Sequence, residues 1–339
     1  SGYDPDTWNQ LCDLGLNSLL IDETYEGAAL GPIAMGGLCE VLGELLLPAP
    51  FFAHAVLACD LLNLSEADAL KQEKLPAWAQ GQALATLGVS STGWATEQID
   101  AQLRADGAGF QLEGIWNHVP HGAQAQDILL CARHEDGRLV IVHLPQDALD
   151  VTPRECLDQT RRQAQVRAQD VPLKPEQIIA SGDEAEALLN YTLDRAGAIL
   201  ACEQVGAAQA TLNQAVDYAK TRRQFGHTIG SFQAVKHMIA DMYTALEAAR
   251  SSAYYALWCA EHDPQELPLA ASSAQTLAAQ ASFLCAGQNI QIHGGIGFTW
   301  EHPAHLYFKR ARANMNLLGD PDHHRQRASA LLGLTPAEA

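Results

Sequence analysis

Apolar positions divide the chain into three zones with different periodicities. Over residues 1–75 they recur at helical spacing, and one run covers 34–46. This run is expected to end before Pro48 and Pro50, because proline lacks the amide hydrogen that a helix interior needs. A further helical run is predicted from about 52 to 62. The first zone therefore predicts a helical domain.

Over residues 76–180 the pattern becomes short and strand-like, which predicts a small antiparallel β domain. Apolar runs at 127–132 and 139–144 are separated by turn signals such as Asp136-Gly137. Residues 181–339 return to long helical patterns, with alanine-rich stretches that favour close helix packing. One of its helical stripes contains Phe232, Val235, Ile239, Met242 and Leu246. The order helical, β, helical follows from these patterns alone.

Charge and cysteine usage narrow the class of protein. The 339 residues carry 21 Lys+Arg against 40 Asp+Glu, a formal net charge of −19. This balance argues against binding of nucleic acid or an anionic membrane by bulk charge. Eight cysteines are scattered without a CxxC pair, which is typical of reduced thiols, and no secretory signal is recognised, so a cytoplasmic location is expected. No apolar run approaches the roughly 20 residues of a spanning helix. His323-His324 beside Asp320 and Asp322 is the nearest candidate for a metal cluster, and we interpret it as a solvated segment.

Two segments could carry chemistry. Arg222-Arg223-Gln224-Phe225-Gly226 places a basic pair, an amide and an aromatic ring where one long helix is predicted to end. Such a corner can offer a guanidinium to a phosphate and a ring beside it. The alternative is an interhelical turn with a solvated arginine pair and a buried phenylalanine.

The second segment runs from Gln291 to Phe298 and follows a predicted helix. Its three glycines, Gly294, Gly295 and Gly297, permit positive φ angles and close approach of a ligand to the backbone. Glycine also ends helices, so this loop alone is weak evidence for a ligand site.

Together and in this order, the two segments resemble motifs of the acyl-CoA dehydrogenases. The first matches R-x-Q-F-G, and the second matches Q-x-x-G-G-x-G-[FY] followed by E-x-P at Glu301 and Pro303. Residues 23–31 are similar to the family's P-E-x-Y-G-G-x-G segment. The resemblance implies an α+β fold: an N-terminal helical domain at 1–75 whose first helices are absent or only not included, a β-barrel domain at 76–180 and a C-terminal four-helix bundle domain at 181–339.

The resemblance also implies FAD, shared across a subunit interface. In the family, one subunit holds the flavin ring and its neighbour supplies groups for the ADP half. Arg222 would meet the pyrophosphate, while Gln224 and Phe225 would lie near the adenosine. The positions that match the family's ADP-side residues are Arg222, Gln224, Phe225, Gln291, Gly294 and Gly295.

The flavin side departs from the family pattern. Where the family has T-E-P-x-x-G-S-D, this chain has only residues 86–92, Thr-Leu-Gly-Val-Ser-Ser-Thr. In the strand that resembles G-x-K-x-W-I-T, the Trp position is His118 and the Thr position is Pro120. Proline offers neither a hydroxyl nor an amide hydrogen. The alternative is a diverged loop that holds flavin in another way.

The family's catalytic base is the second departure. Counting from the matched motifs places Leu318 at one known base position and Ala196 at the other, and neither can accept a proton. The remaining nearby carboxylates are Asp320, Glu301 and Glu203. We therefore expect no catalytic residue in this chain.

These features resemble the smaller, base-lacking subunit of α2β2 acyl-CoA dehydrogenases that act on sterol or bile-acid side-chain CoA thioesters. The segment from His293 to His302 is similar to that subgroup. The resemblance implies a homologous larger partner that binds most of the acyl-CoA, two FAD per tetramer, and an electron-transfer flavoprotein-type acceptor. The alternatives are an autonomous homo-oligomeric enzyme with an atypical base and a FAD-free scaffold or regulatory protein.

Overall fold

The computed structural model describes residues 2–94, 96–107 and 109–334. Its contacts group the chain into two compact units. The sheet unit joins the residues up to Gly31 with Pro48–Ala196, and the helical unit joins Pro32–Leu47 with the residues from Gly197 onward. The three domain boundaries expected from sequence stay a prediction.

The helices of the sheet unit are short. Asp4 caps the first of them, because its carboxylate accepts hydrogen bonds from the backbone amides of Asp6 and Thr7, both at 3.3 Å. Two 3₁₀ turns and a π-helical segment lie between the α-helices. The bounds are α1 (Pro5–Asp13), Leu16–Ser18, Glu23–Tyr25, the π-helical Phe52–Ala58, α3 (Cys59–Leu64) and α4 (Asp68–Ala79).

Eight strands form one mixed sheet, in the order β6-β7-β3-β2-β4-β5-β8, with β1 paired to β4. The β1–β4 and β2–β4 pairs are parallel and the others are antiparallel. Trp116 and Val119 of β3 point into an apolar core with buried residues of four other strands, β2, β4, β5 and β7. The bounds are β1 (Ala85–Gly88), β2 (Gln102–Asp106), β3 (Gly109–Pro120), β4 (Asp127–His134), β5 (Leu139–Pro145), β6 (Asp150–Arg154), β7 (Gln163–Leu173) and β8 (Ile178–Ser181).

The predicted β domain is confirmed, but its sheet is open, which corrects two details. First, β6 and β8 do not pair with each other within the described residues, so the sheet does not close into a barrel. The strand β8 has four residues and leads through Gly182 almost directly into α5, which ends the sheet there. Second, the parallel pairs of β4 make the sheet mixed, whereas the sequence predicted an antiparallel one.

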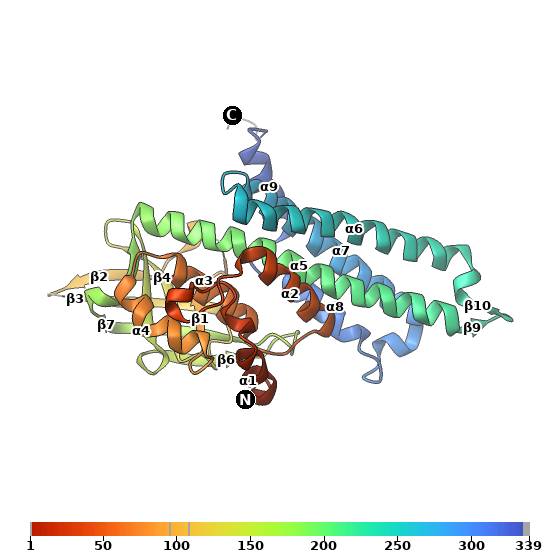
Figure 1. The fold of residues 1–339 in the computed structure, drawn as a ribbon, viewed down its shortest axis with the longest axis horizontal. Helices are drawn as coiled ribbons and strands as arrows, with labels where there is room; N and C mark the ends of the chain where they lie inside the picture. The colour runs from red at the N-terminus through yellow and green to blue at the C-terminus, as the bar shows by residue number, and fades with distance from the viewer. Residues whose placement is uncertain (1, 95, 108, 335–339) are drawn as a thin grey trace. The chain divides into compact units, whose positions relative to one another are not determined.

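Long helices build the helical unit. The helix α5 (Asp183–Thr221) continues into it from the sheet unit, and the α-helices within it are α2 (Gly31–Leu45), α6 (Gln233–His262), α7 (Leu267–His293), α8 (Ala304–Asn314) and α9 (Pro321–Leu331) (Figure 1). Fully buried alanines such as Ala253 of α6 and Ala274 of α7 keep the packed faces narrow, so neighbouring helices approach closely. The predicted C-terminal helical zone is confirmed.

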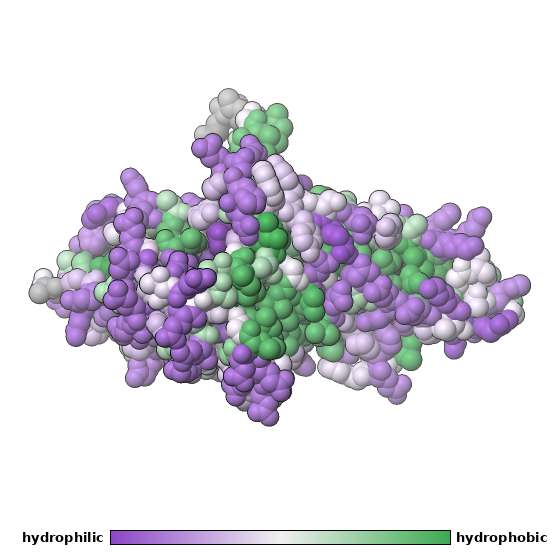
Figure 2. Space-filling model, viewed as in Figure 1, coloured by the Kyte–Doolittle hydropathy of each residue, from purple (hydrophilic) through white to green (hydrophobic). Residues whose placement is uncertain are grey.

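Glycines determine where α2 crosses α5 in the helical unit. A Cβ on Gly206 would collide with the carbonyl of Glu40, and a Cβ on Gly43 would collide with the carbonyl of Glu203. Each glycine thus receives the backbone of the other helix, and any side chain there would force the helices apart. Figure 2 shows hydrophobic residues gathered over α2, whose Val41 and Leu45 are 52% and 68% exposed.

Candidate cofactor site

The Arg222–Gly226 corner is a tight hairpin directly after α5. Strand β9 (Arg223–Gln224) pairs antiparallel with β10 (His227–Thr228). Both turn residues have positive φ, 52° at Phe225 and 80° at Gly226, as a two-residue hairpin turn requires. Phe225 is 89% exposed, so the sequence alternative of a buried phenylalanine is wrong. The hairpin presents an aromatic ring at its tip.

Within this hairpin, one guanidinium remains available to a ligand. Arg223 donates from Nη2 to the carbonyl of Gly226 at 3.0 Å, and Gln224 donates from Nε2 to the carbonyl of Arg223 at 2.8 Å. Arg222 is exposed, and no side chain of the described residues pairs with it. An unpaired guanidinium can form bidentate hydrogen bonds to a phosphate group.

The glycine loop begins where α7 ends. Gly294 has φ 63° and ψ −139°, a combination that is almost restricted to glycine. A Cβ built on Gly294 or Gly295 would meet no atom within 4 Å, so both face open space. Gln291, in the last turn of α7, is exposed as well. A ligand can therefore approach this backbone directly.

The two segments lie at the same end of the helical unit. Tyr218, four residues before Arg222, stacks on His293 with ring centroids 4.3 Å apart and an interplanar angle of 24°. Asn289 of α7 donates from Nδ2 to Oε1 of Gln214 of α5 at 2.9 Å. Figure 1 shows α5 and α7 ending on the same side, beside the β9–β10 hairpin. The segments that carry the six predicted ADP-side residues are thus neighbours.

These residues fit the ADP half of FAD. An unpaired guanidinium suits the pyrophosphate, and exposed glycine backbone permits close contact with it. The exposed Phe225 ring offers an apolar face beside it. Among the residues that the structure describes, no group of three His, Cys, Asp or Glu side chains could hold a metal ion. His323 and His324 are among these residues. The interpretation of this pair as a solvated segment is wrong for His324, because that side chain is buried.

The candidate flavin side does not fit in the same way, because its polar groups already have partners inside the protein. Thr86 is fully buried, and its hydroxyl donates to the carbonyl of Pro120 at 2.5 Å. His118 Nδ1 lies 3.2 Å from Oε1 of Gln163. Ser91 donates to the carboxylate of Asp100 at 2.7 Å. Few donors remain here for a flavin ring.

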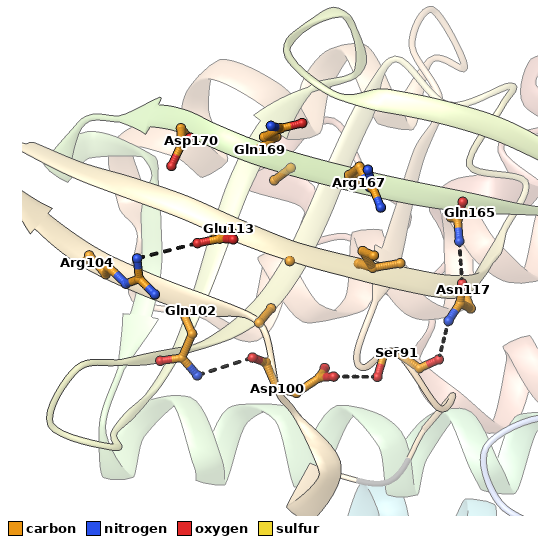
Figure 3. A pocket seen from close by; sticks show the side chains of 14 residues that line it. Ser91, Asp100, Gln102, Arg104, Glu113, Asn117, Gln165, Arg167, Gln169 and Asp170 are labelled. Atoms are coloured by element: carbon orange, nitrogen blue, oxygen red, sulfur yellow. Dashed lines mark hydrogen bonds and ion pairs between the residues drawn. The ribbon is translucent and has the colours of Figure 1, made fainter.

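A polar hollow of about 650 Å³ lies on the outer face of the sheet beside β3 (Figure 3). Asn117 of β3 faces it and donates to the carbonyl of Ser91 at 2.8 Å, while Gln165 donates to Asn117 at 2.6 Å. Arg104 and Glu113 form an ion pair across it at 3.5 Å. None of the predicted ADP-side residues lines this hollow.

Neither predicted base position holds an acid, and both side chains are buried. Ala196 is fully buried on α5, and Leu318 is buried with φ 64° in the turn before α9. Two of the remaining carboxylates have structural partners. Asp320 caps α9 by accepting from the backbone amide of His323 at 2.8 Å, and Glu203 accepts from Arg310 at 2.8 Å in a buried pair.

Sequence reasoning missed the residues that join the two ADP-side segments: Gln214, Tyr218, Asn289 and His293. Their spacing was the available signal, since both pairs are separated by four residues near the end of a long helix. It also missed the buried ion pair in which Arg195 donates to Asp60 at 2.8 and 2.9 Å, one residue from Ala196.

Comparison with known proteins identifies the family. The model of the acyl-CoA dehydrogenase N-terminal domain matches residues 1–82, and that of the C-terminal domain matches 187–331. The chain is 34% identical over 323 residues to acyl-CoA dehydrogenase IpdE2 of Mycobacterium tuberculosis, covering 94% of this chain and 84% of that protein. The chain belongs to the acyl-CoA dehydrogenase family. Its resemblance to that family is confirmed.

Solved structures agree with this acyl-CoA dehydrogenase fold. A variant of the steroid acyl-CoA dehydrogenase Tcur3481–Tcur3483 is 28% identical with a TM-score of 0.88, covering 98% of this chain and 89% of that one. The ChsE4–ChsE5 complex of Mycobacterium tuberculosis is 24% identical with a TM-score of 0.89, covering 99% and 90%, and supports the fold alone. No helix of the described residues is both long and apolar enough to cross a membrane.

Proposed function

We propose that this chain is the base-lacking subunit of a heteromeric, FAD-dependent acyl-CoA dehydrogenase. Its role is to complete the FAD site of a homologous larger subunit across their interface. The observation that carries the proposal is an asymmetry within one chain. Arg222 and the Gly294-Gly295 loop are free to bind a ligand. On the flavin side, the hydroxyl of Thr86 already donates a hydrogen bond to the carbonyl of Pro120.

On this proposal the ADP half of FAD is held from one end of the helical unit. Arg222 binds the pyrophosphate, with Gln224 and Phe225 beside the adenosine. Gln291 supplies its side-chain amide, and Gly294 and Gly295 supply backbone groups that a ligand can reach. When bound, FAD supplies the acceptor for the hydride that leaves the β-carbon of the acyl chain.

On this proposal, neither base position of this chain offers the proton an acceptor. Dehydrogenation removes a proton from the α-carbon and a hydride from the β-carbon, and the two carbons form the new double bond. Leu318 and Ala196 cannot take the proton, and Asp320 is occupied as a helix cap. The carboxylate that takes it, and most of the acyl-CoA site, belong on this proposal to the partner.

The proposed substrate class is a sterol or bile-acid side-chain CoA thioester. Support comes from the 28% identity to a solved steroid acyl-CoA dehydrogenase that pairs two named chains. Exposed apolar residues on α2, among them Val41 and Leu45, are typical of surfaces that an assembly covers. An electron-transfer flavoprotein-type acceptor and a cytoplasmic location remain part of the proposal.

Flavin content tests the proposal. The chain is purified alone and together with its homologous partner, and bound FAD is measured by absorbance. We expect little FAD and no turnover from the chain alone, and two FAD per α2β2 complex with turnover. Stoichiometric FAD and acyl-CoA turnover in the single chain would instead establish an autonomous enzyme. A complex without FAD would establish a scaffold.

A further inference from the structure

Two side-chain contacts join the end of α5 to the end of α7 in the helical unit. One is the hydrogen bond from Asn289 to Gln214 at 2.9 Å. The other is the stack of Tyr218 on His293. Each helix contributes residues four positions apart, so both contacts lie along one face of each helix. The two contacts fix the register of one helix end against the other.

His293 is held on three sides. Its Nδ1 donates to the carbonyl of Asn289 at 2.8 Å, because a carbonyl oxygen only accepts. Tyr218 covers the ring at a centroid distance of 4.3 Å, and His302 approaches it at 4.2 Å with an interplanar angle of 41°. The side chain is 5% exposed. Its orientation is therefore determined by packing and by a hydrogen bond.

The position of His293 in the sequence gives this packing a consequence. The backbone that leaves His293 enters Gly294 at once, and Tyr218 lies one helical turn before Arg222. We therefore expect a shift of the His293 ring against Tyr218 to change the separation between the backbone of Gly294 and the guanidinium of Arg222. Two groups that bind one pyrophosphate must be held to within about 0.5 Å.

We propose that His293, clamped between Tyr218 and His302, is a positioning residue that sets the spacing of the ADP-binding clamp. It acts through Gly294 and Arg222 and does not itself touch the cofactor. This inference rests on the proposed function, in which those two residues bind the ADP half of FAD. The competing explanation is that the stack only stabilises the helix ends.

The test compares variants that remove the ring with variants that keep it, in the assembled complex with its partner. His293→Leu and Tyr218→Leu remove the stack, whereas His293→Phe and Tyr218→Phe preserve an aromatic pair. His262→Leu is the control, because it removes an imidazole from a ring pair with Trp258 on α6, centroids 5.4 Å apart. FAD affinity is measured by titration of the FAD-free complex, and ADP competition by displacement.

We expect both leucine variants to weaken FAD and ADP binding by roughly three- to tenfold, the range measured for aromatic pairs. Tyr218→Phe and His262→Leu should stay within about twofold of the parent complex. His293→Phe keeps the ring but loses the hydrogen bond of Nδ1 to Asn289, so its affinity should lie between those of the parent complex and of His293→Leu. The thermal midpoint of the FAD-free complex is measured in parallel. A stack that only stabilises the helix ends would lower this midpoint and leave the affinities unchanged.

Unchanged FAD and ADP affinity in the leucine variants would overturn the inference, as would an equal loss in His262→Leu. If His293→Leu does not fold, the Tyr218 pair carries the same comparison. Failure of the proposed function is distinguishable, because Arg222→Ala would then leave FAD binding unchanged. If Arg222→Ala weakens binding and both leucine variants do not, the inference on His293 alone is wrong.

Discussion

The candidate ADP-side residues and the candidate flavin-side residues of this chain differ in what their polar groups contact. In the ADP half, the guanidinium of Arg222 and the backbone at Gly294 face open space. In the flavin half, the hydroxyl of Thr86 is bonded to Pro120, and Ser91 is bonded to Asp100. A group that is left without an internal partner is available to a ligand. The contrast therefore separates a surface that can still bind from one whose bonds are satisfied within the chain.

Removing the free guanidinium should have the largest effect. We expect Arg222→Ala in the complex to weaken FAD binding by about 1.5–3 kcal/mol, or roughly 10- to 100-fold, because a charge-assisted contact to pyrophosphate is lost. Titration of the FAD-free complex measures this. The matched change on the flavin side, His118→Ala, should leave the affinity within about twofold. Equal losses from both substitutions would remove the contrast.

Acid should weaken the strand that carries the flavin side. Burial lowers the pKa of His54 from 6.5 to about 4. Its Nδ1 accepts from the backbone amide of Ala85 and its Nε2 donates to the carbonyl of Trp78, both at 3.0 Å. As the pH falls, the unfolded chain binds the proton before the folded chain does, because the pKa of His54 is higher when it is unfolded. The contribution of neutral His54 to the free energy of unfolding is therefore complete above pH 6.5 and declines as the pH falls towards 4, by about 1–2 kcal/mol at pH 5.

Denaturant unfolding at pH 7.5 and pH 5 measures this decline in the free energy of unfolding. His54→Gln, which cannot titrate, should show a smaller decline between the two pH values. His324 of the helical unit, whose pKa is also lowered to about 4 mainly by burial, gives a decline of the same sign. An unchanged decline in His54→Gln would show that β1 is not the acid-sensitive element.

Restoring single flavin-side residues should change little. The family residues are returned in the double variant His118→Trp, Pro120→Thr, and bound FAD of the isolated chain is read from its absorbance. We expect bound FAD to stay far below one per chain, because Thr86 and Ser91 keep their internal partners and one hydroxyl adds at most about 1.5 kcal/mol, or roughly tenfold in affinity. Stoichiometric FAD in this variant would show that His118 and Pro120 alone prevent the parent chain from binding flavin.

Restoring an acid at a base position should have the smallest effect on the rate. Leu318→Glu should leave turnover of the complex nearly unchanged, since a carboxylate needs a flavin ring within hydride reach. Asp320→Asn should be silent as well, because asparagine also caps a helix. Removal of the partner's base should lower the rate by roughly 10²-fold or more. A loss of that size from Asp320→Asn would make this chain catalytic.

Local patterns predicted local structure well. The run at 34–46 is α2 (Gly31–Leu45), and the runs at 127–132 and 139–144 are β4 and β5. The Arg222 corner was also found from sequence, because its residues are contiguous. What the sequence could not show was non-local pairing. The strand order that leaves the sheet open depends on pairing between segments far apart in the chain. The same holds for the helix crossing at Gly43 and Gly206 and for the stack of Tyr218 on His293.

The buried Ala196 and Leu318 bear on how such a chain can evolve. A carboxylate at either site would have to be desolvated, which costs several kcal/mol unless a partner is supplied. Its replacement by an apolar residue removes that cost, so loss of the base is favoured by folding once a partner subunit performs the proton transfer. Reversion runs against folding stability. On the proposed function, a subunit that has lost its acid would therefore depend on the heteromeric assembly, and the surface it offers to the cofactor would be its remaining contribution to the reaction.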